Sequence, residues 1–283
     1  MTTRRFMQLN VFSHETLLGN PLAVVIDGDG LDDATMAAFA RWTNLSETTF
    51  VLPPTDPAAD YRVRIFTPAG ELPFAGHPTL GSCHAWLAAG GRPRRDDEVV
   101  QQCPIGLVRI RRGADRLAFA APPLQRTGAA DEALLERIAH VLRVPRRALV
   151  QHQWVDNGAG WVAVMLPSAD DVLALQPEFG GVRDLMFGVV GARPAGHDTA
   201  FEVRAFFPTP QAVIEDPVTG SLHAGLAQWL IGAGLAPPRY VAAQGSALGR
   251  RGRVHVARET GAGGDTFWIG GDVAGCIEGE VRL

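Results

Sequence analysis

Arg64-Ile65-Phe66-Thr67-Pro68 returns 140 positions later as Arg204-Ala205-Phe206-Phe207-Pro208. A few residues further on, His77-Pro78-Thr79-Leu80-Gly81-Ser82 returns at an offset of 139 as Asp216-Pro217-Val218-Thr219-Gly220-Ser221. Similarity at a fixed period is the signature of an internal duplication. Chance echoes would not fall into one register, so we expect two similar halves.

A third echo extends the register upstream, where Leu22-Ala23-Val24 aligns with Val162-Ala163-Val164. Two similar halves packed about a pseudo-twofold axis would bring equivalent loops together. His77 and Asp216 occupy equivalent loops, so we expect them to face each other across a cleft. Clefts between domains are preferred places for ligand sites.

The length of 283 residues suits two domains of about 140 residues, each large enough for its own core. The Pro122-Pro123 pair marks the linker. We therefore expect an N-terminal repeat domain over 1–123 and a C-terminal repeat domain over 124–271. The last strand, 272–283, is a candidate to cross back to the first domain.

Apolar alternation and turn residues predict many short strands with few helices. Asp32 is placed to cap a helix that ends near Asn44. Pro78 suits the first turn of a second helix, and Pro217 predicts the start of the matching helix, which ends near Gly232. The fold expected is α+β: two pseudo-symmetric domains, each a curved mixed β-sheet wrapped around a central α-helix. Regular alternation of strand and helix is missing, so a doubly wound parallel sheet is less favoured.

The composition is that of a soluble globular protein, with 46 % hydrophobic and 20 % charged residues. The net charge of −4 argues against nucleic acid or an anionic membrane as a partner. No apolar stretch reaches the roughly 18 residues that span a bilayer, and the first residues lack the apolar core of a signal peptide. The three cysteines are widely spaced, which favours reduced thiols in the cytoplasm.

All 26 basic residues are arginine. Pyridoxal Schiff bases, lysine-dependent aldol chemistry and the P-loop each need a lysine amine, so all three are excluded. The histidines and cysteines show neither His-Glu-x-x-His nor Cys-x-x-Cys, and no dinucleotide fingerprint is present. We expect no metal and no cofactor.

Glu47 is the candidate acid–base residue. It follows the end of the first helix and enters the apolar run Phe50-Val51-Leu52. Burial of a carboxylate raises its pKa toward the range in which it takes and returns protons. The alternative is a glutamate that faces solvent or caps the helix. Glu47 has no acidic counterpart in the second half, because position 187 is Phe187.

His77 and Asp216 precede the two helices of the repeat. Helix N-termini favour anions, so the Gly76–His77 turn and the Gly220–Ser221 turn are expected to hold a substrate carboxylate. His77 could instead bond the backbone, and Asp216 could merely cap its helix.

These residues lie in motifs that resemble the PhzF-like family, which includes the phenazine-biosynthesis isomerase and shares the diaminopimelate epimerase fold. The matching stretches run from residue 19 to 250 in family order, so the resemblance covers essentially the whole chain. They are Gly19-Asn20-Pro21-Leu22-Ala23-Val24, Asn44-Leu45-Ser46-Glu47-Thr48-Thr49-Phe50, Pro73-Phe74-Ala75-Gly76-His77-Pro78-Thr79, Glu215-Asp216-Pro217-Val218-Thr219-Gly220-Ser221, Gln244-Gly245 and Gly249-Arg250.

The resemblance implies an active site between two similar domains and a homodimer as the usual assembly. It places the family's catalytic glutamate on Glu47, its histidine on His77, its aspartate on Asp216 and its serine on Ser221. The substrate-binding residues expected are Ser46, Gly76, Gly220 and Ser221. Epimerases of this fold use two opposed cysteines, and the corresponding segments here contain none, which argues against two-thiol racemisation.

The function predicted is a cofactor-independent isomerase that moves a proton on a small carboxylated metabolite, with Glu47 as acid and base and His77 and Asp216 polarising the substrate. Two alternatives stay open. The chain could be a non-catalytic small-molecule binder that kept the cleft, or an epimerase that does not use cysteines.

Overall fold

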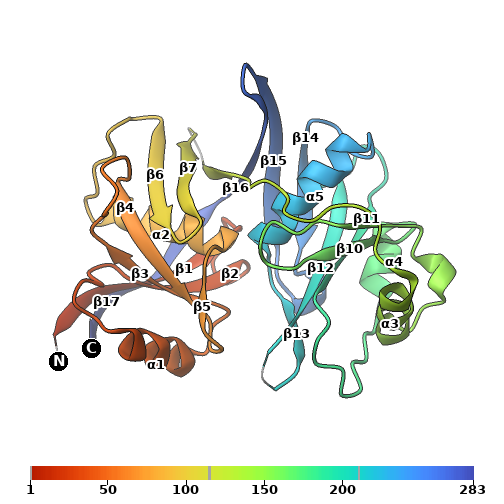
Figure 1. The fold of residues 1–283 in the computed structure, drawn as a ribbon, viewed down its shortest axis with the longest axis horizontal. Helices are drawn as coiled ribbons and strands as arrows, with labels where there is room; N and C mark the ends of the chain where they lie inside the picture. The colour runs from red at the N-terminus through yellow and green to blue at the C-terminus, as the bar shows by residue number, and fades with distance from the viewer. Residues whose placement is uncertain (1, 114–115, 210) are drawn as a thin grey trace. The chain divides into compact units, whose positions relative to one another are not determined.

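The computed structural model describes residues 2–113, 116–209 and 211–283. The chain forms two compact units, one of Met1–Ala120 with Gly270–Leu283 and the other of Ala121–Ile269. A mixed sheet with few helices makes up the fold (Figure 1).

The last strand of the chain belongs to the first unit. β17 (Val273–Arg282) pairs antiparallel with β1 (Thr3–Val11) along its whole length. The backbone N–H of Thr2 donates to the carbonyl of Leu283 at 2.6 Å, so the two ends of the chain lie together, as Figure 1 shows.

The strands of the first unit pair in the order β17-β1-β2-β3-β4-β6-β7-β8, with β5 added on β4. The pairs β2–β3 and β4–β6 are parallel and the others antiparallel. Parallel neighbours need a crossover connection. The connection from β2 to β3 contains α1, and the connection from β4 to β6 contains α2. The remaining elements are β2 (Asn20–Val25), α1 (Asp33–Thr43), β3 (Thr48–Leu52), β4 (Tyr61–Phe66), β5 (Glu71–Leu72), α2 (Gly76–Ala88), β6 (Glu98–Cys103), β7 (Gly106–Arg112) and β8 (Leu117–Ala120).

Local sequence determines both ends of α1, as predicted. The Asp32 side chain accepts from the Thr35 N–H at 2.8 Å, which satisfies one free donor of the first turn. Asn44 adopts a left-handed conformation (φ 52°) and ends the helix. α2 begins at Gly76, so Pro78 lies in its first turn, where a missing N–H has no cost.

α1 and α2 cover opposite faces of the sheet of the first unit. Phe50 of β3 packs in the cluster that includes Met36 and Phe39 of α1. Its neighbour Thr49 accepts a hydrogen bond from Ser82 of α2 at 2.9 Å. Successive side chains of a strand point to opposite faces. The face that carries Thr49 is therefore the face on which α2 lies.

The second unit follows the same alternation of strand directions. Its strands pair in the order β9-β10-β11-β12-β14-β15, with β10–β11 and β12–β14 parallel and β13 added on β12. Its elements are α3 (Glu132–Leu142), a 3₁₀ turn (Arg146–Ala148), β9 (Gln151–Trp154), β10 (Val162–Met165), α4 (Ala169–Ala174), β11 (Phe187–Ala192), β12 (Phe201–Pro208), β13 (Val213–Asp216), α5 (Gly220–Gly232), β14 (Arg239–Gln244), a 3₁₀ turn (Ser246–Leu248), β15 (Gly252–Gly261) and β16 (Gly264–Gly271).

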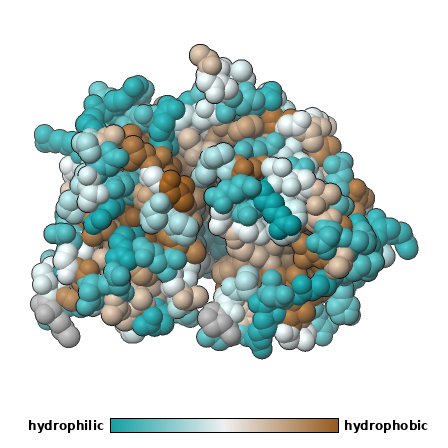
Figure 2. Space-filling model, viewed as in Figure 1, coloured by the Kyte–Doolittle hydropathy of each residue, from teal (hydrophilic) through white to brown (hydrophobic). Residues whose placement is uncertain are grey.

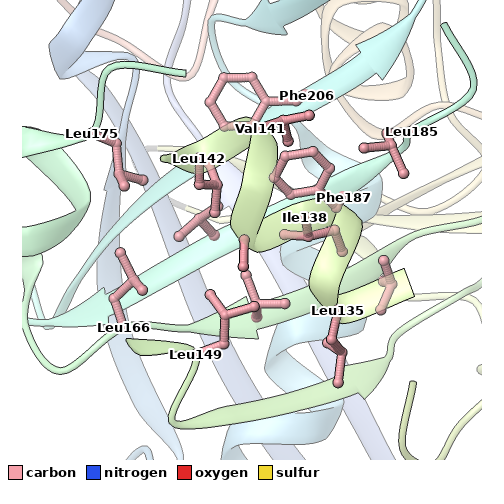
Figure 3. Packing of buried hydrophobic residues seen from close by; sticks show 14 of the residues in the cluster. Leu135, Ile138, Val141, Leu142, Leu149, Leu166, Leu175, Leu185, Phe187 and Phe206 are labelled. Atoms are coloured by element: carbon pink, nitrogen blue, oxygen red, sulfur yellow. The ribbon is translucent and has the colours of Figure 1, made fainter. Parts of the chain in front are cut away.

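One face of this second sheet packs against α3 and the other against α5. Figure 3 shows Ile138 of α3 beside Phe187, in a cluster that also contains Leu135 and Phe206. The ring centroids of Phe187 and Phe206 lie 5.2 Å apart. Gly188, the neighbour of Phe187, faces Leu222 of α5 so closely that a Cβ there would lie 2.6 Å from the leucine Cδ2. Gly188 therefore lets α5 approach the strand.

The predicted start of the second long helix at Pro217 is wrong. α5 begins at Gly220, and Thr219 is its N-cap residue. The four residues of β13 were not predicted as a strand. They pair with β12, where Asp216 lies opposite Ala205. Pairing with a distant strand, which no local pattern reveals, holds Asp216 in extended backbone rather than at a helix cap.

Hydrophilic residues occupy much of the face shown in Figure 2, and apolar residues lie in small areas between them. Among the described helices, none combines the length and the apolar character needed to cross a bilayer. Trp42, 80 % exposed, stacks on Phe39 at the end of α1.

Candidate functional site

Glu47 reaches the α2 face of the first sheet because of the strand that follows it. Thr48 bonds Thr43 of α1 at 2.8 Å, whereas Thr49 bonds Ser82 of α2. Alternation along the backbone places Glu47 on the same side as Thr49. The side chain of Glu47 therefore points toward α2, not toward solvent, and is only 15 % exposed.

His77 is the second residue of α2, and its side chain is 3 % exposed. Its Nδ1 lies 3.4 Å from Oε2 of Glu47. The same nitrogen lies 3.4 Å from Nδ2 of Asn20, the first residue of β2. The structure thus brings together Glu47 and His77, which are 30 positions apart in sequence, and adds Asn20.

Burial keeps the His77 ring neutral. Removal from water lowers the pKa of His77 to about 3, against the opposing effect of a hydrogen bond to the backbone of Pro21. Burial disfavours the charged form of an imidazole because the interior solvates the cation poorly. At pH 7 the ring is therefore an uncharged neighbour of the Glu47 carboxyl group.

The predicted binding residues of the first unit lie next to this pair. Ser46 precedes Glu47 in the turn between α1 and β3 and is half-buried. Gly76 is the first residue of α2, and the N-cap residue Ala75 offers no side-chain acceptor to the helix. The first N–H groups of a helix have no partner within it, so this end of α2 can receive an anion.

Asp216 ends β13 in the second unit and is 6 % exposed. Its Oδ2 accepts a hydrogen bond of 2.5 Å from the Thr219 hydroxyl. Its main-chain carbonyl accepts from Nε2 of Gln244 at 3.0 Å. Both the side chain and the backbone of Asp216 are thus held by buried polar groups.

Ser221, the second residue of α5, is also fixed from two sides. Its Oγ accepts from the indole N–H of Trp161 at 2.9 Å, and its carbonyl accepts from Asn157 at 2.8 Å. Because the hydroxyl oxygen is an acceptor for Trp161, its own proton is available to donate elsewhere. Gly220, the other predicted binding residue, begins the helix.

A buried imidazole also lies behind the first turn of α5. His223 is fully buried, and its Nε2 lies 3.0 Å from Oε1 of Gln244. Burial lowers the pKa of His223 to about 4, and the hydrogen bond with Gln244 opposes this effect. The ring is neutral at pH 7.

The candidate residues divide between the two units. The first unit contains Ser46, Glu47, Gly76 and His77. The second contains Asp216, Gly220 and Ser221.

Sequence reasoning missed five of the polar partners found here. They lie in motifs or elements that the sequence displayed, but no pattern assigned them a role. They are Asn20, Asn157, Trp161, Thr219 and Gln244. The Gln244-Gly245 motif was the available signal for the last of them.

The described part of the chain contains no cluster of three or more His, Cys, Asp or Glu residues that could hold a metal ion. The cysteines lie apart from the candidate residues: Cys83 is buried in α2, Cys103 is buried at the end of β6, and Cys276 is partly buried in β17. Burial raises the pKa of the Cys83 thiol, so it stays protonated.

Comparison with known proteins gives matches along nearly the whole chain. The sequence model of the phenazine biosynthesis-like proteins, PhzC-PhzF, matches residues 9–279. Trans-2,3-dihydro-3-hydroxyanthranilate isomerase of Pseudomonas aeruginosa is 33 % identical over 285 residues, which cover 99 % of both chains. Antisense-enhancing sequence 1 of Schizosaccharomyces pombe is 35 % identical over 297 residues, again 99 % of both.

Solved structures give the same result for the fold. The crystal structure of a Bacillus anthracis phenazine biosynthesis protein of the PhzF family superposes with a TM-score of 0.83 at 22 % identity, over 100 % of both chains.

Proposed function

The chain belongs to the phenazine biosynthesis-like (PhzC-PhzF) family and is an isomerase, and from this premise we propose that it moves a proton on a small carboxylated metabolite through Glu47. The observation that carries the proposal is the 3.4 Å contact between the largely buried Glu47 carboxyl and the neutral His77 ring. A carboxyl group in such surroundings can take a proton from one carbon of a substrate and return it to another.

Glu47, not His77, is the base in this proposal. Burial lowers the pKa of His77 to about 3, so the ring is neutral at pH 7 and is a weak base. The neutral ring instead orients the Glu47 carboxyl and polarises the substrate. Asn20 contacts the same ring nitrogen, Nδ1, and helps to hold the ring in place.

The first turns of α2 and α5 would hold the substrate carboxylate. Gly76 and Gly220 bring main-chain N–H groups within reach without a side chain in the way. Ser221 contributes a hydroxyl donor that Trp161 orients, and Ser46 flanks Glu47. We propose that Asp216, together with His77, polarises the substrate.

The finer fold hypothesis, two pseudo-symmetric domains each wrapped around a central helix, is part of the proposal. It is supported by the matching strand alternation and by a repeated ion pair. Arg64 pairs with Glu71 and lies 5.0 Å from the Phe66 ring. Arg204 pairs with Glu215 and lies 5.3 Å from the Phe206 ring. We also propose that the protein forms a homodimer and that its reaction needs no cofactor. The lack of lysine supports a reaction without pyridoxal, because it excludes Schiff-base chemistry.

Proton transfer is tested by incubating the protein in heavy water with a panel of carboxylated metabolites. The panel should include trans-2,3-dihydro-3-hydroxyanthranilate, the compound in the name of the Pseudomonas relative. Deuterium uptake with a shifted double bond supports the proposal. Loss of optical activity without a bond shift indicates an epimerase, and binding of a compound without any exchange indicates a non-catalytic binder. Either result would overturn the proposal.

A further inference from the structure

We propose that Gln244 and Thr219 are positioning residues that fix the Asp216 carboxylate through a directed chain of hydrogen bonds starting at His223. The inference rests on the proposed function, because it concerns how Asp216 is made ready to meet the substrate. Each link joins buried residues of the second unit: His223 to Gln244, Gln244 to Thr219, and Thr219 to Asp216.

The orientation of the Gln244 amide is unambiguous. Its Oε1 lies 3.0 Å from the backbone N–H of Thr219, a group that can only donate. Nε2 therefore occupies the other side, where it donates to the Asp216 carbonyl at 3.0 Å and to the Thr219 hydroxyl at 2.9 Å. Gln244 is fully buried, so no water competes for these contacts.

This amide determines where the Thr219 proton points. The hydroxyl oxygen accepts from Gln244, so its own proton is free for another acceptor. Oδ2 of Asp216 lies 2.5 Å away and takes it. A hydroxyl that donates to a carboxylate forms a short, charge-assisted hydrogen bond, which holds the Asp216 side chain in one rotamer.

His223 fixes the far end of the chain. Oε1 of Gln244 can only accept, so the proton of the neutral ring must be on Nε2. Nδ1 of His223 is buried and has no hydrogen-bond partner among the described residues, as expected for the unprotonated nitrogen of this tautomer. Donors and acceptors therefore match at every link from His223 to Asp216.

The first unit contains a similar chain that ends differently. Tyr61 donates to Oε1 of Gln101 at 2.8 Å, and Nε2 of Gln101 donates to the Thr79 hydroxyl at 3.0 Å. Thr79 then donates to the main-chain carbonyl of Ala75 at 2.9 Å. This chain fastens the end of α2 and stops at a main-chain carbonyl, whereas the chain of the second unit ends at the Asp216 carboxylate.

The test compares Thr219→Val with Thr199→Val, whose buried hydroxyl contacts the His197 ring and belongs to neither helix end. Each replacement removes one buried hydroxyl of nearly equal shape, so both should lower the melting temperature. Only Thr219→Val should lower kcat, by about 10- to 100-fold with KM little changed, because it releases the Asp216 carboxylate. Equal effects of the two variants on kcat, or a kcat within about twofold of wild type for Thr219→Val, would overturn the inference.

A double-mutant cycle with Asp216→Asn separates this inference from the proposed function. If Thr219 acts through Asp216, Thr219→Val should have little further effect in the Asp216→Asn background. An Asp216→Asn variant with unchanged turnover would disprove the use of Asp216 itself. A slow Asp216→Asn variant beside a fully active Thr219→Val would disprove the positioning role alone.

Two further measurements keep the inference testable if Thr219→Val does not fold. Thr219→Ser and Thr219→Ala differ only in the hydroxyl, and the serine variant should recover most of the turnover that the alanine variant loses. Long-range ¹H–¹⁵N spectra of the histidine rings need no substrate. They should show the Nε2–H tautomer for His223, and an Nδ1–H tautomer would contradict the direction of the chain.

Discussion

At the first turn of α2, the Thr79 hydroxyl donates to the main-chain carbonyl of Ala75, whereas at the first turn of α5 the Thr219 hydroxyl donates to the Asp216 carboxylate. The side chains proposed to act on the substrate also differ in the contacts that hold them. Glu47 and His77 contact each other at 3.4 Å, and the Asn20 side chain also contacts that histidine nitrogen. Asp216 instead ends a chain of short hydrogen bonds.

We relate this difference in contacts to two tasks, proton transfer and substrate binding. A group that gives and takes a proton exists in both protonation states, and a neutral imidazole such as His77 can donate to a carboxylate or accept from a carboxylic acid. A group that binds a substrate benefits from a single fixed orientation. In the proposed function the α2 end transfers the proton and the α5 end positions the substrate, and each prediction below tests one side of that division.

The largest effect is expected at Glu47. Glu47→Gln keeps the shape but removes the acid–base group, so kcat should fall by about 10²- to 10⁴-fold. Binding of a substrate analogue, measured by calorimetry, should stay within about threefold. Glu71→Gln on β5 removes another carboxylate of the same unit, one that pairs with Arg64, and should leave turnover unaffected. A loss of less than tenfold for Glu47→Gln would show that its role is not that of the base.

The packing next to the start of α5 can be disrupted at Gly245, which lies against Pro217. This residue has φ +91°, and a Cβ there would lie 2.6 Å from the Pro217 carbonyl oxygen. Gly245→Ala should lower the free energy of unfolding by about 2–4 kcal/mol, since it adds a steric clash to left-handed strain. Gly249→Ala, also at positive φ but in open space, should cost about 1 kcal/mol. Equal costs in urea denaturation would show that the clash is relieved.

The sequence predicted the parts of this comparison that depend on local chemistry. Asp32 and Asn44 bounded α1, because caps act within one turn of the helix. The family resemblance, which the PhzC-PhzF match confirms, rested on segments that are continuous in sequence. Pro217 was misread as a helix start, because the backbone of Asp216 is paired with Ala205 of another strand.

Residues contributed by distant strands could not be predicted. Gln244 reaches Asp216 and Thr219 because β14 and β13 pair with the same edge of β12, one after the other along that strand. Asn20 is the first residue of β2 and meets a histidine 57 positions away. Such contacts depend on strand register, and periodicity in one segment does not specify register with another.

The protein should become less stable in acid, because a buried histidine lies at the start of α2 and another at the start of α5. The pKa of His77 is lowered to about 3 and that of His223 to about 4, so below about pH 6.5 the unfolded chain binds protons that the folded chain does not. The free energy of unfolding should therefore decrease as the pH is lowered, by roughly 2 kcal/mol per histidine between pH 7 and pH 5.

Urea denaturation of His77→Gln and His223→Gln at both pH values tests this expectation. Each replacement should remove its share of the pH dependence from the unit that contains it. A wild-type protein as stable at pH 5 as at pH 7 would show that the two rings titrate normally in the folded state.

The smallest effect is expected at Ser221, where the comparison between helices is most direct. Ser221 accepts from the Trp161 indole, and Ser82 of α2 donates to Thr49, so Ser221→Ala and Ser82→Ala each delete one buried hydroxyl. Each should lower the free energy of unfolding by about 1 kcal/mol. Only Ser221 is proposed to bind substrate, so Ser221→Ala alone should raise KM, by about five- to tenfold, with kcat within about threefold. A drop in kcat at constant KM would instead assign the Ser221 hydroxyl to the transition state. Such a result would mean that the α5 end takes part in the chemistry and does more than position the substrate.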